Sequence, residues 1–461
     1  MTAETGDIRL DAAAPAGSPF LSWPSVVRAL IACAIASAAL FVVFVAVMAA
    51  AIVLPNDKAI QKHLLDGIDQ KYLAGTSYPS SPFGGDGHRY DMFSDCIGFG
   101  MNLSDAGGSL IQRIADTPTS VHARTDILPC EQLSLDLHTN NVKADSGYLR
   151  FWHGYQAVFR PLLSVMPYDA FVRSIAFMLF GALLFFAWRM ERIFGPWAWP
   201  VILLPFFMIS DFFTVSMVTT HALSLAWIFF TGALTPVVMQ KFPNARRLAL
   251  PLFAFIAGAT YNFLNMLFNP PLAPALIAFI YVAMSLGKDG RKTWQTVAYA
   301  MALAGLWFAG FAAAWIEKWL LAAAVMGPDA VISELKQTFW KYQWTGTHLQ
   351  VSIFSATRLN FFYNWYFAGA LMASLAAGAA LLAWTIRKHG DLTKRLADFA
   401  ALIAPLLVVI AWVEVNRAHS SEHAGFVSRS FVLFSVLPLL AAIKLSRESR
   451  TRASERLATM A

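Results

Sequence analysis

The sequence predicts an all-α, polytopic membrane protein, a bundle of about ten transmembrane helices with one large polar interruption after the first helix. Its composition is 57% hydrophobic and only 14% charged, which excludes an ordinary soluble domain of this length. Apolar runs long enough to cross a bilayer recur along the chain. Basic residues also cluster at alternate ends of these runs, as membrane topology requires.

The first predicted membrane helix, residues 29–54, follows an N-terminal tail at 1–28 and carries no charge. About 26 residues at roughly 1.5 Å each exceed the hydrocarbon core of roughly 30 Å, so this run can span with some tilt. A cleaved signal peptide would be shorter and would start nearer the N-terminus. Between 170 and 443 the remaining apolar runs, one of them short enough to be re-entrant, are centred near 170–188, 196–210, 221–240, 248–266, 272–286, 293–316, 360–386, 396–413 and 429–443.

The positive residues give the predicted orientation. By the positive-inside rule their side of the membrane is cytoplasmic, which places both termini inside and the polar segment, residues 55–169, outside. Further outer loops are expected near 211–221, 259–271, 317–359 and 414–428. The net charge of +7 therefore indicates topology, and no nucleic-acid partner is expected. The basic residues are Arg189, Arg192, Lys241, Arg246, Arg247, Lys288, Arg291, Lys292, Arg387, Lys388, Lys394, Arg395 and those of the tail at 444–461.

The three cysteines fit this orientation. Cys33 lies within the first helix, where it is expected to pack as a small apolar side chain. Cys96 and Cys130 both lie in the polar segment, where a bacterial periplasm or another oxidising compartment would allow a disulfide between them. Two separate reduced thiols are the alternative. Metal ligation is disfavoured because neither belongs to a Cys-x-x-Cys pair.

The polar segment is predicted to contain a helix starting near Asp57, a Gly/Ser/Pro-rich loop at 75–87, and short helices at 109–115 and 131–137. From Tyr148 to Met166, apolar and aromatic residues recur at helical spacing. Arg150, His153 and Arg160 are interspersed among them. This pattern predicts a helix lying in the membrane interface.

Two aspartates in the polar segment are the candidate catalytic acids. Asp91 and Asp95 are four residues apart, so a helix would present both carboxylates on one face, one turn apart. Asp95 is the first choice and Asp91 the second for a general base that takes a proton from an acceptor hydroxyl. Either could instead cap a turn or pair with Arg89, and Asp86 and Asp105 are nearby loop alternatives.

The candidate cationic ligands lie in several polar loops. Arginine and histidine can hold a phosphate through charge-assisted hydrogen bonds. Alternatives are interfacial anchoring for the arginines, a structural hydrogen bond for His221 near Asp211, and metal binding by His419 and His423, for which no third ligand is evident. No cofactor is expected, and nothing in the sequence requires a divalent metal. The proposed donor-phosphate and substrate ligands are Arg150, His153, His221, Arg358, His419, His423 and Arg429.

The chain resembles the GT-C superfamily of polytopic glycosyltransferases. The resemblance is architectural over most of the chain, with Asp91-x-x-x-Asp95 standing where the family's acidic motif is expected; the runs Tyr90–Asn102, Tyr148–Leu163 and Asn416–Arg429 are similar to those of bacterial GT-C-like membrane proteins. The resemblance implies transfer of a sugar from a polyprenyl-phosphate donor to a glycan, lipid or protein acceptor in cell-envelope polysaccharide biosynthesis. The implied location is the outer face of a bacterial inner membrane. Family acidic motifs are more closely spaced and follow the first helix more directly.

Two other function classes stay open. One is a different lipid-linked transferase or ligase. The other is a polytopic transporter or flippase, for which broken helices are typical and for which Tyr261–Pro271 is the candidate break. The sugar, the acceptor and the stereochemical outcome are not determined by these patterns.

Overall fold

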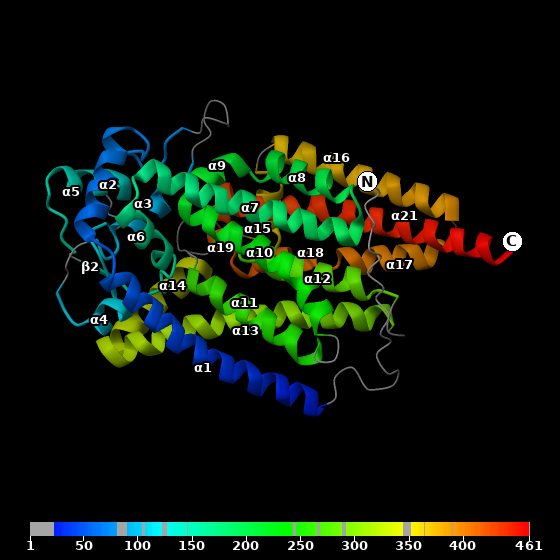
Figure 1. Ribbon diagram of the computed structural model, residues 1–461, viewed down its shortest axis with the longest axis horizontal. Coiled ribbons are helices and arrows are strands. Elements are labelled where there is room, and N and C mark those ends of the chain that lie inside the picture. Colours follow the sequence, from blue (N-terminus) through cyan, green and yellow to red (C-terminus); the bar gives the residue numbers. More distant parts are fainter. Residues whose placement is uncertain are drawn as a thin grey trace, which may run out of the picture.

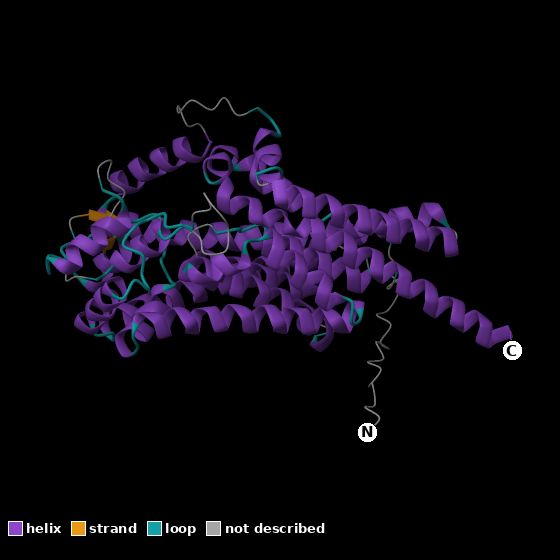
Figure 2. Cartoon of the chain, turned by 90° about the horizontal axis from the view of Figure 1, so that it is seen from above, coloured by secondary structure: helices purple, strands orange, loops and turns teal. Residues whose placement is uncertain are grey.

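The computed structural model describes residues 23–80, 90–103, 107–121, 127–144, 146–242, 246–264, 268–287, 292–343, 352–363, 365–389 and 391–460. Long helices run side by side along the molecule, and most of the polar segment gathers at one end of them, opposite the end where the C-terminal helix projects (Figure 1). Figure 2 shows that the described chain is almost entirely helical, with one small sheet inside the polar segment.

Six helices in the described residues are long and apolar enough to cross a membrane, or seven spans if a bent pair counts as one. The protein is therefore a multi-pass membrane protein by helix length and composition. The bent pair is α17 (Leu392–Ile403) and α18 (Leu406–Val415), which meet at 44°. The six spans lie in α1 (Trp23–Val53), α7 (Tyr168–Phe194), α10 (Thr219–Lys241), α13 (Thr293–Met326), α16 (Trp365–His389) and the run Ala424–Ser449, which comprises α20 (Ala424–Val427), η1 (Ser428–Val432) and part of α21 (Leu433–Met460).

The prediction of about ten membrane helices is not matched by ten long spans. Each predicted run does contain helix, but three form shorter apolar helices: α8 (Ala198–Ile209), α11 (Arg246–Leu264) and α12 (Leu272–Ser285). At roughly 1.5 Å per residue, the 12 residues of α8 are shorter than the hydrocarbon core. The hydropathy of the sequence located the helices. Their observed lengths show which of them are long enough to cross a membrane.

Small residues allow α11 and α13 to pack backbone against backbone. A Cβ added to Gly258 would lie 1.9 Å from the Trp307 carbonyl oxygen, and one added to Gly310 would lie 2.0 Å from that of Phe255. Close approach through small residues is how helices associate in lipid, where van der Waals contact replaces the hydrophobic effect. This contact fixes α11 and α13 relative to each other, and both helices contact the polar segment.

The polar segment folds into short elements. They are α2 (Asp57–Asp69), α3 (Phe93–Gly100), α4 (Leu110–Ala115), β1 (Thr117–Thr119), α5 (Pro129–His138), β2 (Ser146–Tyr148) and α6 (Gln156–Val165). The helices expected at 109–115 and 131–137 are confirmed as α4, capped by Ser109, and α5. The antiparallel pair β1–β2 was not predicted, because three-residue strands carry little sequence signal.

The expected interfacial helix from Tyr148 to Met166 is wrong in its first half. The chain turns at His153, whose φ of 56° is left-handed, and α6 begins only at Gln156. A Cβ at Gly154 would lie 2.3 Å from the ring of Phe263, so this turn is pressed against α11. Trp152 and Tyr155 are buried in the protein. Their aromatic periodicity reflects packing.

Two buried cations attach the polar segment to the membrane helices. Arg160 donates from Nε to the Ala51 carbonyl at 2.8 Å and from Nη1 to that of Asn102 at 2.7 Å, and it pairs with Asp57. Lys318 of α13 donates to the Ala115 carbonyl at the end of α4 at 2.8 Å. A cation at a helix C-terminus is favoured by the exposed carbonyls there.

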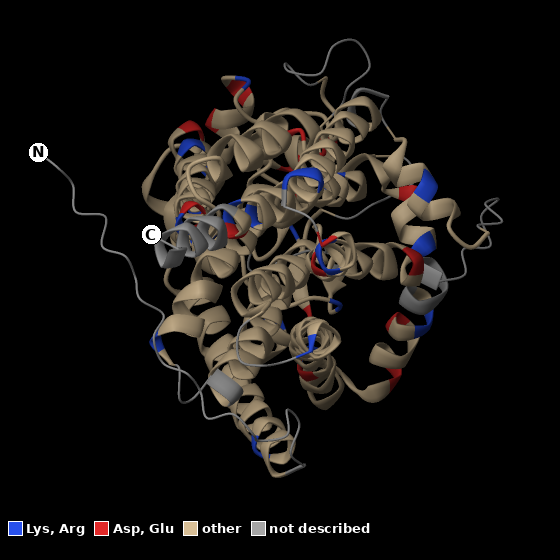
Figure 3. Cartoon of the chain, turned by 90° about the vertical axis from the view of Figure 1, so that its right-hand side faces the viewer, with Lys and Arg blue, Asp and Glu red and all other residues tan. Residues whose placement is uncertain are grey.

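The described loops divide between the two ends of the bundle. At the end away from the polar segment, Arg189 of α7 lies 3.5 Å from Gln240 of α10, and Arg395 of α17 donates to the Leu445 carbonyl of α21 at 3.0 Å. Figure 3 looks onto this end, where blue and red positions stand among mostly tan helices. Lys288 and Arg291 lie outside the described residues. The arrangement agrees with charge confined to helix ends.

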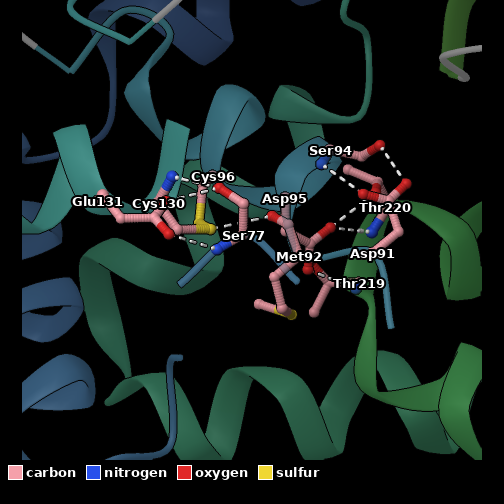
Figure 4. The surroundings of a disulfide bond; sticks show 10 residues. All are labelled: Ser77, Asp91, Met92, Ser94, Asp95, Cys96, Cys130, Glu131, Thr219 and Thr220. Carbon is pink, nitrogen blue, oxygen red and sulfur yellow. Dashed lines mark hydrogen bonds between the residues drawn. A yellow bond between two sulfur atoms is a disulfide. The ribbon is translucent and has the colours of Figure 1, made fainter. Parts of the chain in front are cut away.

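Of the two alternatives for Cys96 and Cys130, the structure contains the disulfide. Cys96 of α3 and Cys130 of α5 are bonded, with their Cα atoms 5.0 Å apart and both side chains buried (Figure 4). Among the described cysteines Cys33 is free and buried. The bond closes a sequence separation of 34 residues and fixes α3 to α5.

Loss of this disulfide is expected to destabilise the polar segment by about 3–4 kcal/mol, because the open chain regains loop entropy. We expect the double variant Cys96→Ser/Cys130→Ser to show a lower Tm by scanning fluorimetry and faster tryptic cleavage in α2. Cys33→Ser is the matched control and should unfold like the parent. An unchanged Tm and cleavage rate in the double variant would contradict a stabilising role.

Candidate functional site

The two candidate aspartates do not share a helix face. Asp91 precedes α3, which begins at Phe93, whereas Asp95 lies in its first turn. Their carboxylates point to different partners (Figure 4). The prediction of two carboxylates one turn apart on one face is therefore wrong, because helical geometry does not extend back to Asp91.

Asp95 caps the N-terminus of the membrane helix α10. Its Oδ2 accepts from the backbone nitrogen and the hydroxyl of Thr219 at 2.6 and 2.8 Å. Its Oδ1 accepts from the same groups of Thr220 at 2.8 and 2.6 Å. Burial raises the pKa of Asp95 to about 6, against the lowering effect of these hydrogen bonds, so the side chain is a carboxylate at neutral pH. Asp95 joins the polar segment to the bundle.

Asp91 is the more accessible carboxylate. It accepts from the Ser94 hydroxyl at 2.9 Å and from the Ser94 backbone nitrogen at 3.3 Å. Its Oδ2 lies 3.5 Å from Nε2 of His221, and its side chain is 20% exposed. Burial raises the pKa of Asp91, while the Ser94 hydrogen bonds and the charges of His423 and Arg429 oppose this increase. The residue thus combines a raised pKa with access.

Aromatic and imidazole rings surround this carboxylate. His221 stacks on Phe268 with ring centroids 4.0 Å apart. Phe426 lies 6.2 Å from Phe268 and stacks on His423 at 5.0 Å. The rings of His419 and His423 are 4.5 Å apart, as their four-residue spacing across α19 (Arg417–Glu422) allows. These rings bring together α10, the 268–271 loop and the stretch from α19 to α20.

Arg429 supplies the fixed positive charge. Its Nη2 lies 3.1 Å from Oδ2 of Asp211, and its guanidinium lies 5.9 Å from the ring centroid of Phe268. The next residue, Ser430, donates to Asn269 at 2.7 Å. Among the described residues Nε of Arg429 has no hydrogen-bond partner. We call Asp91, His221, His419, His423 and Arg429 the Asp91 cluster.

His221 was expected to lie near Asp211, but the structure pairs each with another residue. His221 faces Asp91, and Asp211 holds Arg429. Asp211 takes a left-handed conformation, with φ of 53°, between α8 and α9 (Phe212–Met217). The short loop therefore turns the two side chains toward different elements.

Three other predicted ligands are not joined to the cluster. Arg150 pairs with Glu334 of α14 (Pro328–Gln343) at 2.6 Å, which fixes the polar segment to that helix. His153 is fully buried, with Nδ1 3.2 Å from the Tyr155 hydroxyl; burial and the charges of Lys318 and Arg150 lower its pKa. These two contacts are structural. A direct substrate role for either is not favoured by the geometry.

Arg358 lies on α15 (Ser355–Phe361) with an exposed side chain. Within the described residues, no hydrogen bond or ion pair joins it to the Asp91 cluster. The loop alternatives Asp86 and Asp105, and the possible pairing partner Arg89, lie outside the described residues. The cluster therefore contains five of the predicted site residues. Asp95 is not among them, but it binds Thr219 and Thr220, which directly precede His221.

Sequence reasoning missed Ser94, Phe268 and Phe426, which also contribute to the cluster. Ser94 follows Asp91 by three residues, the spacing at which an aspartate before a helix accepts from the backbone, and this was the available signal. The two phenylalanines had none, since the chain has 37 phenylalanines. Their stacking on His221 and His423 depends on tertiary packing.

Over the residues that the structure describes, no group of three or more His, Cys, Asp or Glu side chains is arranged to hold a metal ion. His419 and His423 remain a pair. The chemistry that the cluster can support is proton transfer by Asp91 and stabilisation of negative charge by Arg429 and the histidines.

Comparisons with protein-family models, with curated proteins and with solved structures found no match for this chain.

Proposed function

We propose that this protein is a glycosyltransferase that moves a sugar from a polyprenyl-phosphate donor to a hydroxyl of a glycan, glycolipid or protein acceptor. The observation that carries the proposal is the Asp91 cluster: a partly exposed carboxylate beside His221, with Arg429 and His423 near enough to affect its pKa, at one end of an apolar bundle. A lipid-linked donor would place its chain among the membrane helices and its phosphate at this end.

Asp91 is the proposed general base in place of Asp95. Both oxygens of Asp95 accept two hydrogen bonds each within the protein, so no lone pair of a buried carboxylate is left aimed at a substrate. Asp91 has one local partner, Ser94, and an exposed part. A base must reach the proton it removes, and geometry decides this before pKa does.

Arg429 and His423 are the proposed phosphate ligands. A guanidinium has five N–H donors, and Arg429 gives one to Asp211, which holds the side chain in place. Charge-assisted hydrogen bonds to a phosphate are stronger than neutral ones. His419 lies against His423 and would orient it.

The proposed reaction needs no group beyond these residues. Asp91 takes the proton of the acceptor hydroxyl as its oxygen bonds to the anomeric carbon. The bond between that carbon and the phosphate oxygen breaks, and the electron pair leaves with the polyprenyl phosphate. Arg429 and His423 stabilise the charge that develops on the phosphate.

The proposed location is the outer face of a bacterial inner membrane, with the polar segment in the periplasm or exterior. The buried Cys96–Cys130 disulfide supports it, because disulfides persist in oxidising compartments. The basic residues at the opposite end of the bundle support the same orientation by the positive-inside rule.

The test is turnover by the purified protein in detergent or nanodiscs. A set of radiolabelled polyprenyl-phosphate sugars, including arabinofuranose, a hexose and an amino sugar, is offered with envelope glycan acceptors. Transfer of label to an acceptor is the expected result. Absence of transfer from every donor, with folded protein, would oppose the proposal.

Transport of a lipid-linked substrate is the second candidate. The observation in its favour is the 44° bend between α17 and α18, at Ala404 and Pro405, since broken helices are typical of transporters. Movement of a fluorescent polyprenyl-phosphate sugar across proteoliposomes without bond cleavage would favour this candidate.

The pH dependence of transfer should respond to Ser94. Since Asp91 must be ionised to act as a base, activity falls as the pH drops through its pKa. Ser94→Ala removes a hydrogen bond that lowers this pKa, so the acid limb of kcat/KM should move up by about one pH unit, with the alkaline plateau preserved. Ser164→Ala, in α6, is the control. A limb that does not move in Ser94→Ala would argue against Asp91 as the base.

A further inference from the structure

Tyr78 lies in a stretch that is hydrogen-bonded to the stretch that carries Asp91. The backbone nitrogen of Tyr90 donates to the Pro79 carbonyl at 3.1 Å, and that of Met92 donates to the Ser77 carbonyl at 3.1 Å. These bonds hold the two stretches side by side. The charge of Asp91 is close enough to the Tyr78 phenol to raise its pKa.

The ring of Tyr78 packs on a neighbouring ring and remains partly exposed to solvent. Its ring stacks on Phe93 at 5.9 Å, nearly parallel, and the side chain is 40% exposed. The preceding residue is fixed by Glu131, which accepts from the Ser77 hydroxyl at 2.8 Å. Burial and the charges of Asp91, Glu131 and Glu422 raise the pKa of Tyr78 to about 12, so the phenol keeps its proton as a hydrogen-bond donor.

A second half-exposed tyrosine lies at the Arg429 side of the cluster. Tyr363, which follows α15, is 48% exposed. Its hydroxyl lies 3.1 Å from the position that a Cβ on Gly425 would take, so it covers the backbone between His423 and Phe426. A larger residue at 425 would displace it. The cluster thus has an exposed aromatic ring near each of its two ends.

We infer that Tyr78 and Tyr363, with the carboxylate of Glu422, form the acceptor subsite and that the acceptor is a carbohydrate. This rests on the proposed function and specifies its acceptor. Sugar rings present apolar C–H faces that pack on aromatic rings and hydroxyls that donate to carboxylates, which is the combination of groups found here. A lipid hydroxyl would need an apolar surface, and a peptide would need backbone partners.

The location next to Asp91 adds a geometric reason. A sugar packed on the exposed side of Tyr78 would present a hydroxyl toward the nearby Asp91 carboxylate, where its proton is to be removed. Tyrosine binds with little loss of conformational freedom, because it has only two side-chain torsions. The acceptor is therefore oriented by a stretch that is hydrogen-bonded to the one that carries the base.

Binding of oligosaccharides to the Asp91→Asn variant tests the subsite without requiring turnover. The probes are hexasaccharides of arabinofuranose, mannose, glucose and N-acetylglucosamine, measured by saturation-transfer NMR and calorimetry in nanodiscs. We expect at least one to bind, and Tyr78→Ala to weaken that binding about tenfold. Tyr72→Ala is the matched control and should bind normally, because Tyr72 is an exposed tyrosine of the same segment that lies just after α2.

Tyr78→Phe guards against a folding defect, since it keeps the stacked ring and removes only the hydroxyl. It should bind better than Tyr78→Ala, and Tyr363→Ala should weaken binding independently. The inference is overturned if no probe binds to folded protein at 10 mM-scale concentrations, roughly the limit for a single weak sugar site, or if Tyr72→Ala and Tyr78→Ala behave alike. Binding without transfer by the parent protein would instead oppose the proposed function alone.

Discussion

Replacement of Asp91 by asparagine is expected to lower the rate of sugar transfer about 10²–10⁴-fold, the contribution typical of a positioned general base. The amide keeps the size of the carboxylate and can still accept from Ser94, whose hydroxyl is 2.9 Å away. It cannot accept a proton. The loss should therefore appear in kcat, with the Tm close to that of the parent protein.

Asp69→Asn is the control for this experiment. Asp69 is an exposed aspartate of the same polar segment, paired with His138 at 3.1 Å, and an exposed pair of this kind contributes little. Its variant should transfer sugar at the parental rate. If Asp91→Asn retained parental kcat, Asp91 would not be the base, whatever the donor proves to be.

Replacement of Asp95 by alanine is expected to lower the free energy of unfolding by about 3–5 kcal/mol. Four donors, the backbone nitrogens and hydroxyls of Thr219 and Thr220, would lose their acceptor in a buried site. Helix α10 would also lose the negative charge at its N-terminus, which interacts favourably with the positive end of the helix dipole. The polar segment would be detached from the bundle at this point.

The measurement is thermal unfolding in detergent, together with the yield of monodisperse protein. Asp95→Asn should also be destabilising, because its amide nitrogen would face donors and not acceptors. Asp91→Asn serves as the comparison, since the same change four residues earlier should leave Tm nearly unchanged. A parental Tm in Asp95→Ala would mean that the cap is dispensable. The two aspartates are thus expected to differ in kind, one affecting rate and the other stability.

Several features of the fold followed from the sequence because they depend on local composition. A helix such as α1 is predicted by a run of uncharged residues, since a buried charge in lipid is unfavourable wherever the rest of the chain lies. The cap of α4 at Ser109 depends on residues within one turn. The sequence does not choose between a Cys96–Cys130 disulfide and two free thiols, because pairing depends on a distance that spacing does not give.

The candidate site was less predictable. Spacing alone suggested that Asp91 and Asp95 share a face, but α3 starts between them, and Asp95 turns to α10, more than 120 positions away along the chain. The aromatic residues around His153 had the period of a surface helix, yet His153 turns the chain and is buried. Periodicity reports that one face is apolar, and it does not report whether lipid or protein covers that face.

By itself the sequence determined the class of protein, the helices, and the presence of acids and cations in loops between them, because hydropathy and helix propensity act over a few turns. The tertiary structure decided which of these groups meet. Asp91 faces His221, and Arg429 is held by Asp211, through contacts between residues more than 100 positions apart. Such contacts depend on how the helices pack. Local periodicity and residue spacing in the sequence do not reveal that packing. The same packing gives two neighbouring aspartates different proposed tasks.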